Sequence, residues 1–114
     1  MRFKLAGLLI ATSALIAPAA LADIYNLEID QFERTVDGKT LKGISINGTS
    51  PGPLLRLREG EHVTINVTNT LDVDTSLHWH GIILEADMDG VPGISFDGIA
   101  PGETYTYNFT ANQS

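Results

Sequence analysis

The chain has 114 residues, no cysteine and a formal net charge of −7 at pH 7. This length suits one small domain, and disulfide bonds cannot stabilise it. The acidic balance disfavours nucleic acid and anionic membranes as partners, and it mildly favours cations.

Residues 1–22 have the pattern of a secretory signal peptide. Arg2 and Lys4 precede an apolar run over residues 5–17, and residues 20–22 place small side chains at the cleavage position. The run is shorter than the roughly 20 apolar residues that span a bilayer. We therefore expect cleavage after residue 22, a periplasmic or secreted location, and no membrane span in the mature chain.

After the signal, apolar and polar residues alternate with the period of two that is typical of β-strands. Six strands are predicted in chain order, at residues 25–29, 41–46, 54–57, 63–67, 75–84 and 105–109. Asp37-Gly38 and Glu59-Gly60 predict turns, and residues 47–53 and 85–102 predict loops. No helical pattern of useful length interrupts this series. The expected fold class is therefore all-β, a Greek-key β-sandwich.

The predicted strands are fewer than such a sandwich usually has, which is seven or more. The last of them also runs almost to Ser114 without a closing turn. We therefore expect residues 23–114 to form a partial domain, incomplete at its C-terminal end, with one strand edge unpaired.

The stretch from Ser76 to Gly81, SLHWHG, holds two of the three histidines around the only tryptophan. In a strand, His78 and His80 project from one face with their α-carbons roughly 6.5–7 Å apart, while Trp79 faces the other way. Such imidazoles can converge on one metal ion or serve two neighbouring ions, although a bare pair is more often two surface histidines. Trp79 as an anchor, and the acidic loop EADMDG that follows, favour a metal site.

Other candidate ligands are few. His62 stands alone at a strand start beside Glu61, and a solvated side chain is the simpler interpretation. Two histidines are too few for a closed structural zinc site, and a blue-copper centre needs a cysteine thiolate. A mononuclear zinc or copper hydrolytic site in which His62 joins the pair is the least favoured alternative.

Three motifs carry a resemblance to a known family. H-W-H-G at residues 78–81, M-D-G-V-P at 88–92 and P-G-E-T-Y-x-Y-x-F at 101–109 occur in the order and spacing of the first cupredoxin domain of multicopper oxidases. Upstream, INGTSPGPLLRLREGEHVTINVTN also resembles the N-terminal strands of that domain. Within the family, GISFDGIAPGE resembles bacterial copper-resistance oxidases more than the laccases of fungi and plants.

The resemblance implies a role for each matching position. His78 matches a ligand of the type 2 copper and His80 a ligand of a type 3 copper, so the pair would serve two ions of a trinuclear copper cluster. Asp89 matches a carboxylate near the cluster that is implicated in proton delivery. The family oxidises a reducing substrate, here cuprous ion or a phenol-like compound, and reduces dioxygen to water.

The chain also departs from the family pattern. It lacks the second H-x-H and the C-terminal H-x-x-H-x-H and H-C-H motifs, which complete the cluster and build the type 1 site, and it has no twin-arginine signal. We therefore expect the N-terminal portion of a longer copper-resistance oxidase, inactive alone and completed by the remaining cupredoxin domains. The alternative is a stand-alone exported module that binds and buffers copper without catalysis.

Overall fold

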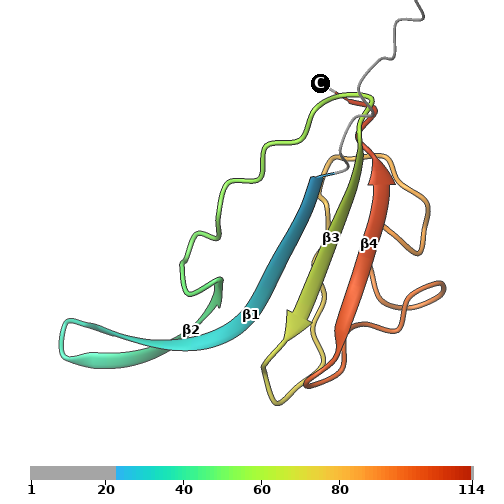
Figure 1. The fold of residues 1–114 in the computed structure, drawn as a ribbon. Coiled ribbons are helices and arrows are strands. Elements are labelled where there is room, and N and C mark those ends of the chain that lie inside the picture. The colour runs from blue at the N-terminus through green and yellow to red at the C-terminus, as the bar shows by residue number, and fades with distance from the viewer. Residues whose placement is uncertain (1–22, 114) are drawn as a thin grey trace, which may run out of the picture.

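The computed structural model describes residues 23–113, and all regular secondary structure in these residues is β-strand. The four strands are β1 (Asp23–Val36), β2 (Lys39–Ile46), β3 (His62–Asn69) and β4 (Thr104–Thr110). They form one open sheet in the order β2-β1-β3-β4, and only the β1–β3 pair is parallel (Figure 1). The expected all-β class is confirmed. The predicted signal peptide lies outside the described residues.

Strand β3 pairs with β1 on one side and β4 on the other, and its residues 62–68 alternate between polar and apolar side chains. Val63, Ile65 and Val67 are at most 3% exposed and face the core, as the alternation predicts. On the other face, Thr64 donates a hydrogen bond to Asn108, and the amide of Asn66 donates to Asn26. One face of the sheet is therefore apolar and buried, and the other is a polar ladder that faces solvent.

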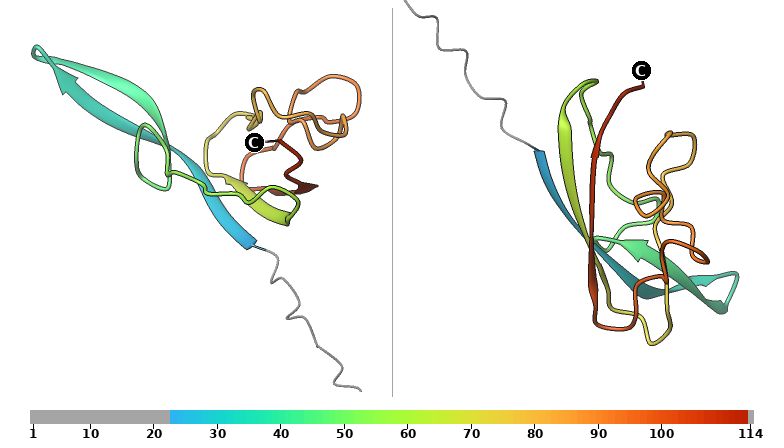
Figure 2. Two further views of the ribbon diagram at one scale, coloured as in Figure 1. Left: turned by 90° about the horizontal axis from the view of Figure 1, so that it is seen from above. Right: turned by 90° about the vertical axis from the view of Figure 1, so that its right-hand side faces the viewer.

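Two long irregular segments, residues 47–61 and 70–103, lie against the apolar face of the sheet (Figure 2, right). Phe96 and Ile99, from the second segment, are almost fully buried against Leu27, Ile29 and other sheet residues. The core therefore has two layers, of which the described residues build one as a sheet and the other from loops.

Two predicted strands are not formed. In residues 54–57 the side chains of Leu55 and Leu57 pack on the core, but the backbone makes no strand pairing. In residues 75–84 only Thr75 pairs, as an isolated bridge with Ile99. The reason is a turn directly after the histidines, in which the Ile82 N–H donates to the Trp79 carbonyl and Gly81 adopts a φ of +86°. A left-handed glycine and a turn hydrogen bond end any strand there.

The distal part of the β1–β2 hairpin extends beyond the core as a two-stranded arm (Figure 2, left). Its turn lies at Asp37-Gly38, as predicted, and both residues have positive φ angles, as a two-residue hairpin turn requires. Along the arm the ring of Phe32 covers Gly43, where a β-carbon would lie 2.8 Å from the ring. Gly43 is therefore the position at which the Phe32 ring crosses the partner strand.

Tyr107, on β4, is fully buried and makes the stability of the fold sensitive to alkaline pH. Burial raises its pKa above the usual value of about 10; the Leu77 N–H opposes this shift and Tyr105 adds to it. Because the folded pKa exceeds the unfolded one, the contribution of Tyr107 to stability is present below about pH 10 and is lost as pH rises through the folded pKa. Urea midpoints measured up to about pH 11 should fall less in Tyr107→Phe than in the wild type. Equal losses in the two proteins would contradict this assignment.

Candidate metal centre

The histidine segment keeps the alternation of a strand although its backbone pairs with no neighbour. Leu77 and Trp79 pack against the core, whereas His78 and His80 are exposed. The two imidazole rings lie side by side, with centroids 5.6 Å apart and planes at 84°. The prediction that both histidines project from one face is therefore confirmed, together with the opposite direction of Trp79.

Trp79 anchors this segment to the sheet. Its ring contacts Tyr107 edge-to-face, with centroids 5.3 Å apart, and lies tilted against Phe109 at 5.7 Å. Such aromatic pairs contribute about 0.5–1.5 kcal/mol beyond the area they bury. The indole N–H is buried and finds no acceptor within residues 23–113. Trp79 therefore holds the two flanking histidines through apolar contact alone.

The ring of His78 is fixed by the acidic loop. Its Nδ1 lies 2.8 Å from the main-chain carbonyl oxygen of Asp89 and 3.5 Å from the Oδ1 of the Asp89 carboxylate. A carbonyl oxygen only accepts hydrogen bonds, so Nδ1 carries the proton and donates it. In the neutral ring the lone pair is then on Nε2. His78 is therefore prepared to bind a metal ion through Nε2.

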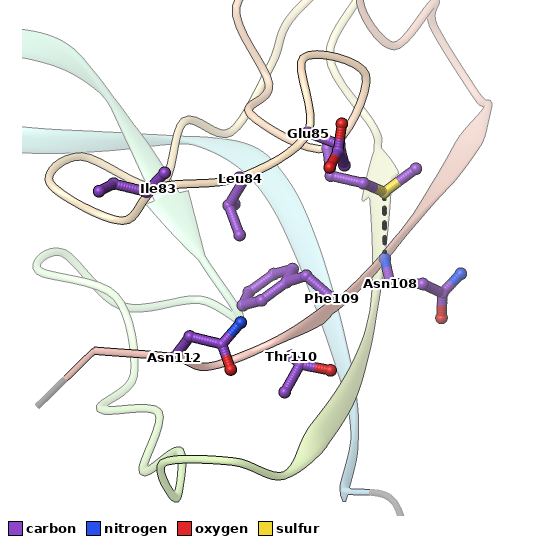
Figure 3. A pocket seen from close by; sticks show the side chains of 8 residues that line it. Ile83, Leu84, Glu85, Asn108, Phe109, Thr110 and Asn112 are labelled. Carbon is purple, nitrogen blue, oxygen red and sulfur yellow. Dashed lines mark hydrogen bonds between the residues drawn. The ribbon is translucent and has the colours of Figure 1, made fainter.

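Contacts to β4 hold the acidic loop in place. The Tyr105 hydroxyl donates to the Asp87 carbonyl at 2.8 Å, and the Asn108 N–H donates to the Met88 sulfur at 3.2 Å (Figure 3, dashed line). Within the loop, the Met88 N–H donates to the Glu85 carbonyl. The two residues that precede Asp89, Asp87 and Met88, are therefore hydrogen-bonded to β4.

One cavity lies against the residues that follow the histidine segment, and another borders the segment itself. The first, of about 340 Å³, lies between residues 83–88 and β4, and neither histidine lines it (Figure 3). The second, of about 320 Å³, is bordered by His78 and Trp79 and by apolar side chains that include Leu27, Leu55 and Leu57. His78 thus borders an apolar groove, whereas His80 lines neither cavity.

The donor set suits copper but is incomplete. Imidazole nitrogen is a good ligand for copper and for zinc. Within residues 23–113, however, no three His, Cys, Asp or Glu side chains gather closely enough to hold one ion. His62, at the start of β3, therefore does not join the pair, which removes the support for a three-ligand hydrolytic site.

Sequence reasoning missed several residues around the pair. The side chain of Gln113 bonds on both sides of the turn after His80, donating to the Gly81 carbonyl and accepting from the Ile83 N–H. The Leu77 N–H points at the Tyr107 hydroxyl at 3.5 Å. The alternation of Tyr105 and Tyr107 with polar residues predicted an inward tyrosine, whereas nothing in the local pattern marks Gln113.

Among the described residues no helix is long and apolar enough to cross a membrane.

Comparisons with known proteins identify the family of the chain. The sequence profile described as multicopper oxidase matches residues 28–114. A copper resistance protein A homologue of Pseudomonas syringae pv. tomato is 54% identical over 89 residues, which are 78% of this chain and 15% of that protein. Laccase-2 of Botryotinia fuckeliana is 44% identical over 78% of this chain and 16% of its own length.

A solved structure shows the same fold. The crystal structure of a multi-copper oxidase from Pseudomonas thermotolerans superposes on this chain with a TM-score of 0.75 and 35% sequence identity. The alignment covers 82% of this chain and 23% of the oxidase. The chain thus spans only a small part of the length of the relatives it matches. The profile match over residues 28–114 includes the histidine segment, and the chain belongs to the multicopper oxidase family.

Proposed function

We propose that residues 23–114 are the first cupredoxin-like domain, in part, of a periplasmic multicopper oxidase that confers copper resistance. The observation that carries the proposal is the exposed histidine pair, with its rings 5.6 Å apart and Nδ1 of His78 already engaged by Asp89. The higher identity to a copper resistance protein A homologue than to a laccase supports this subfamily. The amino-terminal pattern of residues 1–22 supports export.

Each residue of the site then has a distinct role. His78 supplies one ligand to a type 2 copper and His80 supplies one to a type 3 copper, and further ligands come from outside residues 23–113. When bound, the copper cluster supplies the electron transfer that couples oxidation of cuprous ion or phenol-like substrates to reduction of dioxygen. The carboxylate of Asp89, half-buried and 3.5 Å from Nδ1 of His78, is placed to hold or release a proton beside the ring.

A second candidate is a stand-alone exported module that binds and buffers copper. The observation that favours it is that both imidazoles are exposed and oriented within this chain by its own contacts. The two candidates share the histidine pair as a copper site, and they differ in whether the chain forms part of a longer oxidase that turns over substrate.

Copper binding tests the shared part of both candidates. The purified chain is expected to bind copper through the pair, and His78→Ala with His80→Ala should weaken binding by more than the roughly 10- to 100-fold that loss of an outer partner costs. A competition titration with a copper chelator measures this affinity. His62→Ala is the control and should bind like the wild type, since His62 lies outside the pair. If the double variant also binds like the wild type, the pair is not the site.

Oxygen consumption separates the two candidates. With copper and a phenol-like substrate, the 114-residue chain should consume no dioxygen, whereas an oxidase that contains this chain should consume it and lose that activity in His78→Ala. An oxidase whose rate is unchanged by His78→Ala would contradict the ligand role of His78.

A further inference from the structure

Gly90 occupies the point at which the acidic loop passes closest to the histidine segment. It is buried, and its φ is +74°. A β-carbon at this position would overlap the carbonyl oxygen of Leu77 and would lie 3.2 Å from the Tyr107 hydroxyl. Only a residue without a side chain lets the two backbones approach in this way.

The chain neighbours of this contact are the residues of the metal centre. Leu77 directly precedes His78, and Gly90 directly follows Asp89. The close approach of the Gly90 and Leu77 backbones therefore brings the Asp89 carbonyl to 2.8 Å from Nδ1 of His78. A side chain at position 90 would push the loop away from the segment and lengthen that hydrogen bond.

We propose that Gly90 is a positioning residue: by docking against Leu77, it makes the main-chain carbonyl of Asp89, not the carboxylate, the group that fixes the His78 ring. This inference rests on the proposed copper site and adds a division of labour to it. The carbonyl holds Nδ1–H, so Nε2 is free for the metal ion, and the carboxylate, at 3.5 Å, is not committed to orienting the ring. The main-chain carbonyl oxygen of Asp89 thus orients the His78 ring, and its carboxylate remains available for another role.

The chain offers a matched control. Gly48 has a φ of +73°, almost equal to that of Gly90, but a β-carbon there would meet nothing within 4 Å. Alanine costs similar backbone strain at both positions, and only at position 90 does it also meet a neighbouring backbone. The difference between Gly90→Ala and Gly48→Ala therefore reports the contact with Leu77.

The test reads the protonated nitrogen of His78 by ¹H–¹⁵N NMR of the metal-free chain at alkaline pH, where imidazoles are neutral. The wild type and Gly48→Ala should show the Nδ1–H form of His78. Gly90→Ala should lose this preference and show a mixture of the Nδ1–H and Nε2–H forms, as a solvated histidine does. Copper affinity should fall about 10- to 100-fold in Gly90→Ala and stay within a few-fold in Gly48→Ala, as loss of an outer partner predicts.

A second variant keeps the proposal testable if Gly90→Ala does not fold. Asp89→Ala removes the carboxylate but leaves the main-chain carbonyl, so His78 should remain in the Nδ1–H form. Loss of that form in Asp89→Ala, or its persistence in a folded Gly90→Ala, overturns the proposal. Because this readout is taken without metal, it is independent of whether the wild type binds copper, and only failure of the copper titration counts against the proposed function.

Discussion

Replacement of Asn69 by alanine is expected to destabilise the fold strongly. Asn69 is fully buried at the end of β3, where its amide donates to the carbonyls of Val73 and Ile99 at 2.9 and 2.7 Å and its oxygen accepts from the Leu71 N–H at 2.9 Å. Alanine would leave the Val73 carbonyl and the Leu71 N–H without partners, while the Ile99 carbonyl would keep the Thr75 N–H. At about 1–3 kcal/mol for each group left unsatisfied, the expected loss in the free energy of unfolding is about 2–6 kcal/mol.

That loss is a large share of the total, since small domains are stable by only about 5–15 kcal/mol. Urea or thermal unfolding followed by circular dichroism measures it. Asn66→Ala is the control, because Asn66 lies on the same strand but faces the polar side, where its bonds to Asn26 and Thr106 are exposed. It should cost about 1 kcal/mol or less. Equal losses in the two variants would show that the buried amide is not a structural hub.

Asn69 also shows what the sequence pattern could and could not predict. The alternation of Val63, Ile65 and Val67 predicted the buried face of β3, and continuing it by two residues places Asn69 inward as well. Its bonding partners lie in residues 71–99, in loops whose paths depend on tertiary contacts. The direction of the side chain was therefore predictable, and its three hydrogen bonds were not.

The histidine segment divides in the same way. The direction of each side chain from 77 to 80 follows from local alternation, which the structure keeps. The predicted strand at 75–84 is wrong because no neighbouring strand pairs with these residues beyond the single bridge at Thr75. The turn at Gly81 and the side chain of Gln113 occupy the backbone groups instead. Strand pairing is a long-range property, and a single sequence carries no direct signal of it.

Family resemblance predicted more than local pattern did. The motifs from His78 to Phe109 indicated multicopper oxidases, and the match over residues 28–114 confirms that family. Spacing alone could not have found the contact between Asp89 and His78, since the two residues are eleven apart in a loop without regular structure. The copper-binding roles of His78 and His80 remain predictions that the proposed titration tests, and the role of Asp89 in proton delivery also remains a prediction.

Removal of the Trp79 side chain is expected to loosen the site and the fold together. Trp79 joins the histidine segment to β4 through Tyr107 and Phe109, at ring distances of 5.3 and 5.7 Å. Replacement of a large core aromatic residue by alanine lowers the free energy of unfolding by about 3–5 kcal/mol. Because Trp79 is only half-buried, we expect a loss at the lower end, about 3 kcal/mol. Trp79→Ala should also weaken copper binding, because the flanking His78 and His80 lose their shared anchor.

Trp79→Phe should cost much less, about 1 kcal/mol. The indole N–H is buried without an acceptor among the described residues, so phenylalanine removes an unsatisfied donor while it keeps an aromatic ring against β4. Circular dichroism must report the unfolding, since Trp79 is the only tryptophan and both variants lose its fluorescence. Ile83→Ala, at a side chain 85% exposed, is the control and should change neither stability nor copper affinity. If Trp79→Ala behaves like Ile83→Ala, the histidines are held by the acidic loop alone and the aromatic anchor has no part in the site.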